Sequence, residues 1–266
     1  MEKSMEMLET ITKDAGNLIR SFFSTYGFSS KTKRDKTIVT EADYAANRFI
    51  QSEISKHFPA EPILSEEGNT VFDSSNQNSW VVDPLDGTTN FSLGLHYWGV
   101  SIARLKNGLP VMAALYFPLL DEFFMAVEGS GAFLNGKKIR INTAILENRT
   151  PVLLCCSRSR KHFDINLQYK TRILGSAAYN LCAVASGRAF LAIEATPKIW
   201  DLSAAWLIIT EAGGFVSMLD NSSPFPLHPG EDYSASSFPL LAGVSKEQID
   251  YGQSMISPIM PPDEYK

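Results

Sequence analysis

The chain has 266 residues, enough for one large domain or two closely packed ones with a substantial core. Its hydrophobic content of 44% and charged content of 20% are typical of globular proteins, and a net charge of −5 argues against a nucleic-acid-binding surface. Three cysteines are too few for a disulfide framework, the N-terminal stretch is too charged for a signal peptide, and no apolar run is long enough to span a membrane. We therefore expect a cytoplasmic protein without nucleic-acid or membrane partners.

Two helices and a short strand are expected first along the chain. Apolar residues at helical spacing predict an amphipathic helix over 4–23. Asp43 lies three residues after a threonine, in a pattern that resembles a capping box and predicts a second helix to about residue 57. A strand over 63–65 then leads to Glu66. Judged locally, Asp43 is a helix cap, and Glu66 with its acidic neighbour is a solvated turn.

The stretch 80–91 places two carboxylates, Asp83 and Asp86, at the mouth of a predicted strand. The apolar residues 80–82 indicate the end of a buried strand, and Pro84 cannot continue the hydrogen-bond ladder, so we expect the chain to turn there. A glycine and two threonines follow. This concentration of oxygen ligands suits a hard divalent cation, whereas the alternative is an ordinary Pro-Asp-Gly turn with Asx capping.

The residues after this stretch indicate an antiparallel sheet. Strands are expected over 97–104, 111–117 and 122–127, with no helices between them. An Asn-Gly pair between short extended runs predicts a hairpin within 131–140. The first half, residues 1–145, is thus expected to be an α+β subdomain.

The second half, residues 146–266, changes to an α/β pattern with a mixed or parallel sheet. Strands are expected over 151–156, 188–193, 215–219 and 239–244, and helices over 175–186 and 202–212. Asp201 lies where the second of these helices begins, so its local interpretation is again a cap. Cys155 and Cys156 are expected to be small buried hydrophobic residues, and the proline-rich tail after residue 256 is expected to be poorly ordered.

Two long motifs resemble the signatures of one family, the inositol monophosphatases. Residues 80–91, Trp-Val-Val-Asp-Pro-Leu-Asp-Gly-Thr-Thr-Asn-Phe, are similar to its first signature. Residues 200–205 with the Glu-Ala-Gly-Gly of 211–214 are similar to its second. The motifs at 39–43, 66–67 and 175–180 follow the family's order and spacing, so the resemblance extends from the first helix to about residue 245.

The resemblance implies a fold and an activity. The fold would be of the α+β and α/β class, a layered α-β-α-β-α sandwich. An antiparallel N-terminal sheet with a helix pair would be joined to a C-terminal mixed sheet with helices. The activity would be that of a Mg²⁺-dependent, lithium-sensitive phosphomonoesterase, and the enzyme would be a homodimer.

The resemblance also implies roles for individual residues. The positions that match metal ligands of two to three Mg²⁺ ions are Glu66, Asp83, the backbone carbonyl of Leu85, Asp86 and Asp201. Asp43, Glu66 and Thr88 match catalytic positions, with Asp43 and Thr88 orienting the attacking water. The physics agrees, because clustered carboxylates repel one another without cations, and phosphate monoester hydrolysis needs a very large reduction of its barrier. Water would attack in line, without a protein nucleophile.

The phosphate and the leaving group have candidate contacts as well. The backbone N–H groups of Gly87, Thr88 and Thr89 could open a helix whose positive end holds the phosphate, with Gly87 allowing its close approach. Residues that match the substrate pocket are Gly175, Ser176, Ala177, Glu194 and Asp201. A strand end for Glu194 and a helix cap for Ser176 are the structural alternatives.

The expected substrate is a small phosphorylated polyol or sugar. Inositol 1-phosphate is the leading candidate, with fructose 1,6-bisphosphate as a further substrate. The alternatives are histidinol phosphate, a 3′(2′),5′-bisphosphate nucleotide, or a regulatory binding role on the same fold. The complete set of acidic residues argues against a role in binding alone.

Overall fold

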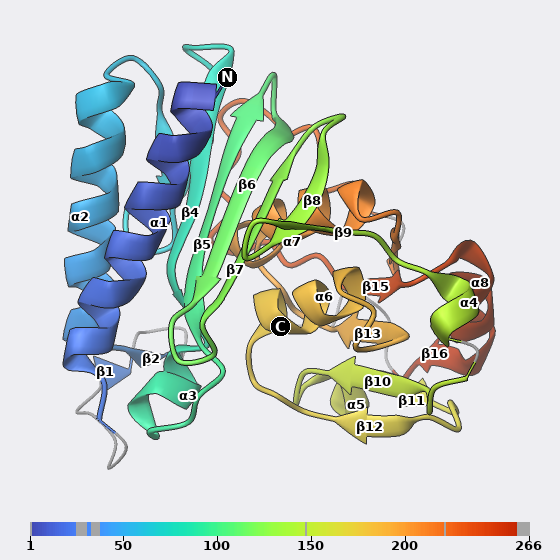
Figure 1. Cartoon of the computed structure of the whole chain (residues 1–266). Coiled ribbons are helices and arrows are strands. Elements are labelled where there is room, and N and C mark those ends of the chain that lie inside the picture. The colour runs from blue at the N-terminus through green and yellow to red at the C-terminus, as the bar shows by residue number, and fades with distance from the viewer. Residues whose placement is uncertain (1, 25–30, 33–37, 147, 221, 260–266) are drawn as a thin grey trace.

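The computed structural model describes residues 2–24, 31–32, 38–146, 148–220 and 222–259. Helices and sheets alternate in layers (Figure 1): α1 and α2, a large sheet, α6 and α7, a second sheet, and α8. This order confirms the layered sandwich of helices and sheets.

The large sheet has the strand order β3-β4-β5-β6-β7-β8-β9. Its strands are β3 (Ile63–Ser65), β4 (Asn78–Asp86), β5 (Gly99–Lys106), β6 (Leu109–Phe117), β7 (Glu122–Val127), β8 (Gly131–Leu134) and β9 (Lys137–Ile139). Neighbours pair antiparallel from β4 to β9, as predicted, whereas β3 lies parallel to β4. Asn135 and Gly136, with φ of 50° and 74°, form the predicted hairpin turn.

Two long helices, α1 (Glu2–Phe22) and α2 (Glu41–His57), cover one face of this sheet. Buried Leu8, Ile11, Ala15 and Ile19 recur at helical spacing on α1 and pack in the cluster below it. The predicted capping box opens α2: the Thr40 N–H donates to Asp43 Oδ2 at 2.8 Å, and the Thr40 hydroxyl accepts from the backbone N–H of Ala42 at 3.2 Å.

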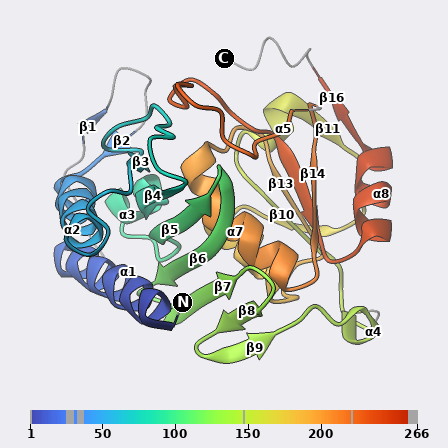
Figure 2. The ribbon, with the colours of Figure 1, turned by 90° about the horizontal axis from the view of Figure 1, so that it is seen from above.

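The opposite face of the large sheet is covered by α7 (Ile199–Glu211), with α6 (Ala177–Ala185) beside it. Figure 2 shows α7 between the large sheet and the second sheet. Most of its residues are apolar and buried, as expected of a helix covered on both sides. Both halves of the chain therefore contribute to one buried cluster, and the division into subdomains 1–145 and 146–266 stays a prediction.

The second sheet has the order β12-β10-β13-β15-β14. Its strands are β10 (Val152–Cys155), β12 (Lys170–Arg172), β13 (Leu191–Glu194), β14 (Phe215–Met218) and β15 (Leu240–Gly243). Parallel pairing of β10 with β12 and β13, and antiparallel pairing of β15 with β13 and β14, make it the predicted mixed sheet. The helix α8 (Lys246–Met255) covers its outer face.

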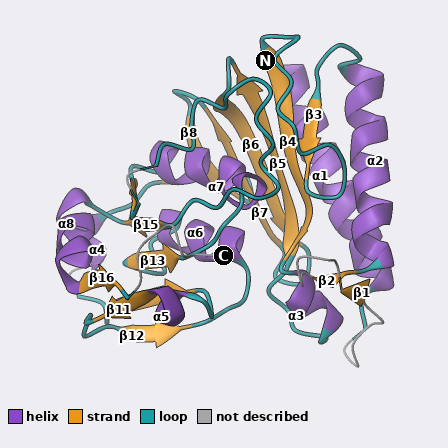
Figure 3. Ribbon diagram, turned by 180° about the vertical axis from the view of Figure 1, so that it is seen from behind, coloured by secondary structure: helices purple, strands orange, loops and turns teal. Residues whose placement is uncertain are grey.

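Shorter elements complete the described fold. These are β1 (Lys31–Thr32), β2 (Ile38–Val39), α3 (Thr88–Ser92), α4 (Thr143–Leu146), α5 (Ser159–His162), β11 (Phe163–Ile165) and β16 (Ile256–Pro258). Figure 3 shows α3 at the end of the large sheet near β1 and β2. Because β16 pairs with β11, the expectation of a poorly ordered tail after residue 256 is wrong for residues 257–258. The tail from residue 260 lies outside the described residues.

The expected turn at Pro84 is also wrong, because β4 continues to Asp86. The register with β5 shifts between Asp83 and Asp86, so Pro84 lies in an irregular stretch where its missing N–H breaks no ladder bond. This bulge lets the strand reach the site without turning.

Cysteine burial partly follows the prediction. Cys155 and Cys182 are buried free thiols, whereas Cys156 is only partly buried. No helix among the described residues is long and apolar enough to cross a membrane.

Candidate active site

The end of β4 provides two buried carboxylates. Side chains alternate along the strand, so Trp80 and Val82 pack toward α1 and α2 while Val81 packs on the other side. Asp83 shares the side of Val81 and therefore faces α7. Its Oδ1 accepts from the backbone N–H of Leu85 at 3.0 Å.

Asp201, in the first turn of α7, approaches Asp83 and Asp86 from the other half of the chain. Carboxylate oxygens of these three residues lie within 4.8 Å of one another. Asp201 Oδ2 also accepts from the backbone N–H of Lys198 at 2.8 Å, so the expected capping contact is present too. Asp201 therefore caps α7 and belongs to the carboxylate cluster at the same time.

Glu66 follows β3, which runs beside β4, and its backbone N–H donates to the carbonyl of Val82 at 3.2 Å. Its side chain lines the same cavity as the carboxylate cluster. The charge of Glu66 contributes to raising the pKa of Asp83, after the larger effect of burial. The parallel strand pair is therefore what brings Glu66 to the cluster.

The carboxylates are electrostatically unfavourable as a bare set. Burial, then the charge of Asp201, raise the pKa of Asp86 to about 7. Burial raises the pKa of Asp201 to about 6, and it raises that of Asp83 well above its ordinary value. A divalent cation would relieve this repulsion, and carboxylate oxygens are the ligands that Mg²⁺ and Ca²⁺ prefer. The donor set fits such an ion.

Asp43 reaches the site through Thr88. Thr88 Oγ1 lies 3.2 Å from Asp43 Oδ1 and 2.9 Å from the carbonyl oxygen of Leu85. Burial raises the pKa of Asp43 to about 6, while hydrogen bonds from Thr40 act in the opposite direction. Asp43 thus caps α2 with one oxygen and contacts Thr88 with the other.

Gly87 precedes the predicted helix, which is the short helix α3. Its φ is 85°, and a Cβ at this position would lie 2.7 Å from the carbonyl oxygen of Tyr97. The structure therefore gives a reason for glycine that differs from the expected one: the neighbouring backbone, rather than a ligand, excludes a side chain.

The start of α6 binds Asp86 directly. The Ser176 hydroxyl donates to Asp86 Oδ2 and also accepts from the backbone N–H of Tyr179 at 3.1 Å as the helix cap. Backbone hydrogen bonds from Ala177 and Ala178 lower the pKa of Asp86, against the effect of burial. Ser176 is therefore both the cap of the structural alternative and a partner of the carboxylate cluster.

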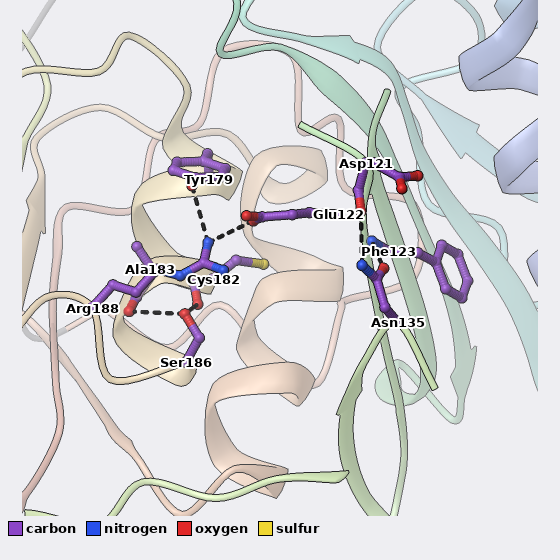
Figure 4. A network of polar contacts seen from close by, with 9 residues as sticks. All are labelled: Asp121, Glu122, Phe123, Asn135, Tyr179, Cys182, Ala183, Ser186 and Arg188. Atoms are coloured by element: carbon purple, nitrogen blue, oxygen red, sulfur yellow. Dashed lines mark hydrogen bonds and ion pairs between the residues drawn. The ribbon is translucent and has the colours of Figure 1, made fainter. Parts of the chain in front are cut away.

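A polar network also holds Tyr179, in the first turn of α6 (Figure 4). Arg188 Nη1 donates to Glu122 Oε2 at 2.6 Å and to the Tyr179 hydroxyl at 3.1 Å. The Tyr179 ring packs against Phe117 with centroids 4.9 Å apart. Because the Tyr179 N–H donates to Ser176, this network links β7 to the turn that contacts Asp86.

Glu194 ends β13 and faces α6, since Leu191 and Ile193 of the same strand pack toward α8. Asn180 Nδ2 donates to Glu194 Oε1 at 2.7 Å. Burial raises the pKa of Glu194 to about 8. Glu194 is 2% exposed, so the structural alternative of a solvated strand end does not apply.

The carboxylate cluster, the start of α3, the start of α6 and Glu194 surround one cavity of about 400 Å³. The predicted site residues that line it are Glu66, Asp83, Leu85, Asp86, Gly87, Thr88, Thr89, Gly175, Ser176, Ala177, Glu194 and Asp201. Asp43 is the predicted residue that is not among the lining residues, and it contacts Thr88 from behind.

The cavity also contains residues that the sequence did not single out. These are Asn90, Cys156, Ser157, Arg158, Ile173, Asn180, Thr196 and Pro197. Asn90 lies inside the first signature and Asn180 inside the motif at 175–180, so the resemblance to the family was the available signal for them. For Arg158, whose Nη1 donates to Thr196 Oγ1 at 2.9 Å, local sequence held no such signal.

Comparison with known proteins agrees with this geometry. The family model described as "Inositol monophosphatase family" matches residues 1–249. The chain belongs to the inositol monophosphatase family. Inositol monophosphatase 3 of Solanum lycopersicum is 34% identical over 232 residues, covering 81% of this chain and 86% of the relative.

A curated relative and a solved structure from Thermotoga maritima also match the chain. Fructose-1,6-bisphosphatase/inositol-1-monophosphatase of this organism is 35% identical over 217 residues, covering 78% of this chain and 81% of the relative. The solved structure of an IMPase from the same organism matches with a TM-score of 0.76 and 30% identity, covering 96% of this chain and 98% of that one. As a member of the inositol monophosphatase family, the present chain is a phosphomonoester hydrolase.

Proposed function

We propose that the chain hydrolyses inositol 1-phosphate to inositol and phosphate, with two to three Mg²⁺ ions as cofactors. The observation that supports it most is the convergence of Asp83, Asp86 and Asp201, whose oxygens lie within 4.8 Å of one another. Glu66 and the Leu85 carbonyl complete the proposed ligand set. Mg²⁺ bound there would supply a Lewis acid for the phosphoryl oxygens and lower the pKa of the attacking water.

Thr88 and Asp43 are proposed to orient that water. The single hydroxyl proton of Thr88 can be donated to Asp43 Oδ1 or to the Leu85 carbonyl, at 3.2 and 2.9 Å. Either arrangement leaves lone pairs on Oγ1 free to accept a hydrogen bond from water. Asp43 is itself held by Thr40, so the position of the Thr88 hydroxyl is determined by the start of α2.

The phosphate is proposed to bind at the start of α3. The N–H groups of Gly87, Thr88 and Thr89 lie at that end, where backbone donors and the helix dipole favour an anion. With the phosphate there, the leaving group would extend toward Ser176, Ala177 and Glu194, which line the same cavity. Glu194 is proposed to accept hydrogen bonds from hydroxyl groups of the inositol.

A phosphate-release screen tests this function. The substrates are inositol 1-phosphate, fructose 1,6-bisphosphate, histidinol phosphate and adenosine 3′,5′-bisphosphate, each with Mg²⁺, with EDTA, and with Mg²⁺ plus Li⁺. We expect inositol 1-phosphate to give the highest kcat/KM, with loss of activity in EDTA and inhibition by Li⁺. Release of phosphate in EDTA at the rate seen with Mg²⁺ would refute the metal mechanism, and a preference for histidinol phosphate would refute the substrate.

Fructose 1,6-bisphosphate is the second candidate substrate, because Arg158 places a cation on the wall of an otherwise acidic cavity. A relative of 35% identity bears the name of both activities. An arginine at this position suits a second phosphate on the leaving group. Arg158→Gln should therefore lower kcat/KM for the bisphosphate more than for inositol 1-phosphate, and equal losses would remove this role.

We also propose a homodimer. Exposed apolar side chains near the cavity, Leu93, Leu95 and Ile173, support an interface between copies, because each is more than half exposed. Light scattering coupled to size-exclusion chromatography should give twice the chain mass of 29.4 kDa. A monomer at micromolar concentration would contradict it.

A further inference from the structure

Asn180 is a buried polar residue to which the proposed mechanism assigns no role. It lies on α6 one turn after Ser176, so both side chains project from the same face of the helix. The Asn180 side chain is 1% exposed and lines the cavity. Its Nδ2 donates to Glu194 Oε1 at 2.7 Å, a contact that links α6 to β13.

The other end of the Asn180 amide has no partner. Oδ1 is buried and makes no hydrogen bond with the described residues. Rotating the amide by 180° does not remedy this, because Oδ1 would then face the Glu194 carboxylate and Nδ2 would lose its acceptor. Since an unpaired buried carbonyl oxygen is unfavourable, stability alone does not explain an asparagine here. The contact with Glu194 does explain it.

Glu194 requires such a contact. Its backbone is fixed by pairing with Leu240 of β15, but its carboxylate lies in a cavity whose other acidic groups, Asp86 and Asp201, repel it. The Asn180 amide counters this repulsion with a donor on the α6 side. A carboxylate that recognises hydroxyl groups has to be held in one orientation before the ligand arrives.

We propose that Asn180 is a positioning residue that holds the Glu194 carboxylate toward the leaving group, so that this pair selects substrates whose leaving group has hydroxyls. The inference rests on the proposed function of the cavity. It assigns to Asn180 no contact with the metal ions or with the phosphate. Asn180 acts on selectivity through Glu194.

The test measures selectivity as the ratio of kcat/KM for inositol 1-phosphate to kcat/KM for p-nitrophenyl phosphate, whose leaving group has no such hydroxyls. Asn180→Leu keeps the approximate size of the side chain and removes the donor. We expect this ratio to fall roughly tenfold, the effect of losing one hydrogen bond that orients Glu194, mainly through a higher KM for inositol 1-phosphate. Asn180→Ala serves as the second variant if the leucine is not accommodated.

A double-mutant cycle shows whether Asn180 acts through Glu194. In a Glu194→Ala background, Asn180→Leu should change the ratio by less than about twofold, because the group that it positions is absent. Ser186→Ala is the control: Ser186 caps the C-terminal end of the same helix, away from the cavity, and its hydroxyl donates to the backbone carbonyls of Cys182 and Ala183. This variant should leave the ratio unchanged.

The outcomes separate this inference from the proposed function. If wild-type protein hydrolyses another polyol or sugar phosphate instead of inositol 1-phosphate, the proposed substrate fails and the ratio is measured with that compound. An unchanged ratio in both Asn180 variants, or the same loss in the Glu194→Ala background, overturns the inference. A wild-type enzyme without preference for hydroxylated leaving groups overturns it as well. A lower melting temperature with an unchanged ratio would mean that Asn180 is only structural.

Discussion

At the residue scale, Asp86 connects more parts of the site than any other residue described above. It shares the cluster with Asp83 and Asp201, and it accepts a hydrogen bond from Ser176. Its buried carboxylate has a pKa raised to about 7, chiefly by burial. A charged Asp86 carboxylate is therefore unfavourable without a bound cation and favourable with one.

Asp86→Asn should weaken metal binding without weakening the fold. The amide retains the shape and one oxygen but loses the charge, so kcat/KM should fall at least about a thousandfold, because Lewis-acid stabilisation is worth several kcal/mol. The melting temperature in EDTA should stay the same or rise, since one repelling charge is gone. Both quantities are measured by steady-state kinetics and thermal unfolding.

Asp250→Asn provides the matched control for this change. Asp250 lies on α8 and pairs with Lys246 at 3.3 Å on the surface. The same chemical substitution there should leave kcat/KM within twofold. Activity of Asp86→Asn above about a tenth of wild type would exclude Asp86 from the ligand set.

At the scale of elements, the first turn of α6 is held by two sets of contacts. Ser176 ties its start to Asp86, and Arg188 ties Tyr179 to Glu122 on β7. The helix presents Ser176, Ala177 and Asn180 to the cavity. Its placement between the sheets therefore determines the geometry on the leaving-group side.

Arg188→Gln should lower the free energy of unfolding by about 1 kcal/mol, because the pair with Glu122 is partly solvent-screened. Since the network acts at a distance from the carboxylates, kcat/KM should fall less than tenfold. Urea unfolding and steady-state kinetics measure the two effects. Lys246→Gln, which removes an exposed pair on α8, should change stability by less than 0.5 kcal/mol. Equal effects of the two variants would show that the Arg188 network is not stabilising.

At the scale of the whole molecule, the site buries carboxyl groups from both halves of the chain. Asp43, Asp86, Asp201 and Glu194 have pKa values of about 6, 7, 6 and 8, in each case raised mainly by burial. Their ordinary values are near 4. Without metal, the folded protein therefore binds more protons than the unfolded chain across this interval.

This difference in proton binding predicts how stability depends on pH. Where the folded state holds the extra protons, stability falls as pH rises, so in EDTA the melting temperature should fall from about pH 4 to pH 8. Mg²⁺ replaces these protons and should raise the melting temperature more at pH 8 than at pH 5. NaCl at equal ionic strength controls for screening. A constant or rising melting temperature in EDTA over this range would contradict the prediction.

Local sequence predicted the features that local interactions decide. The capping box at Thr40 and Asp43 and the Asn135-Gly136 turn formed as expected, because neighbouring residues satisfy the backbone hydrogen bonds there. Short apolar runs predicted most strands of both sheets. The bulge at Pro84 was not predictable in this way, since pairing with β5 keeps the strand intact beyond the proline.

The sequence by itself determined the family, the layered fold and the acidic residues of the candidate site, because these depend on motifs and local patterns. The tertiary structure alone decided which of the site residues lie against one another. Asp83 and Asp201 face each other because side chains alternate along β4 and because α7 lies between the sheets. Asn180 and Glu194 pair because α6 covers one face of β13. Contacts between distant segments arise from packing, which no local pattern contains.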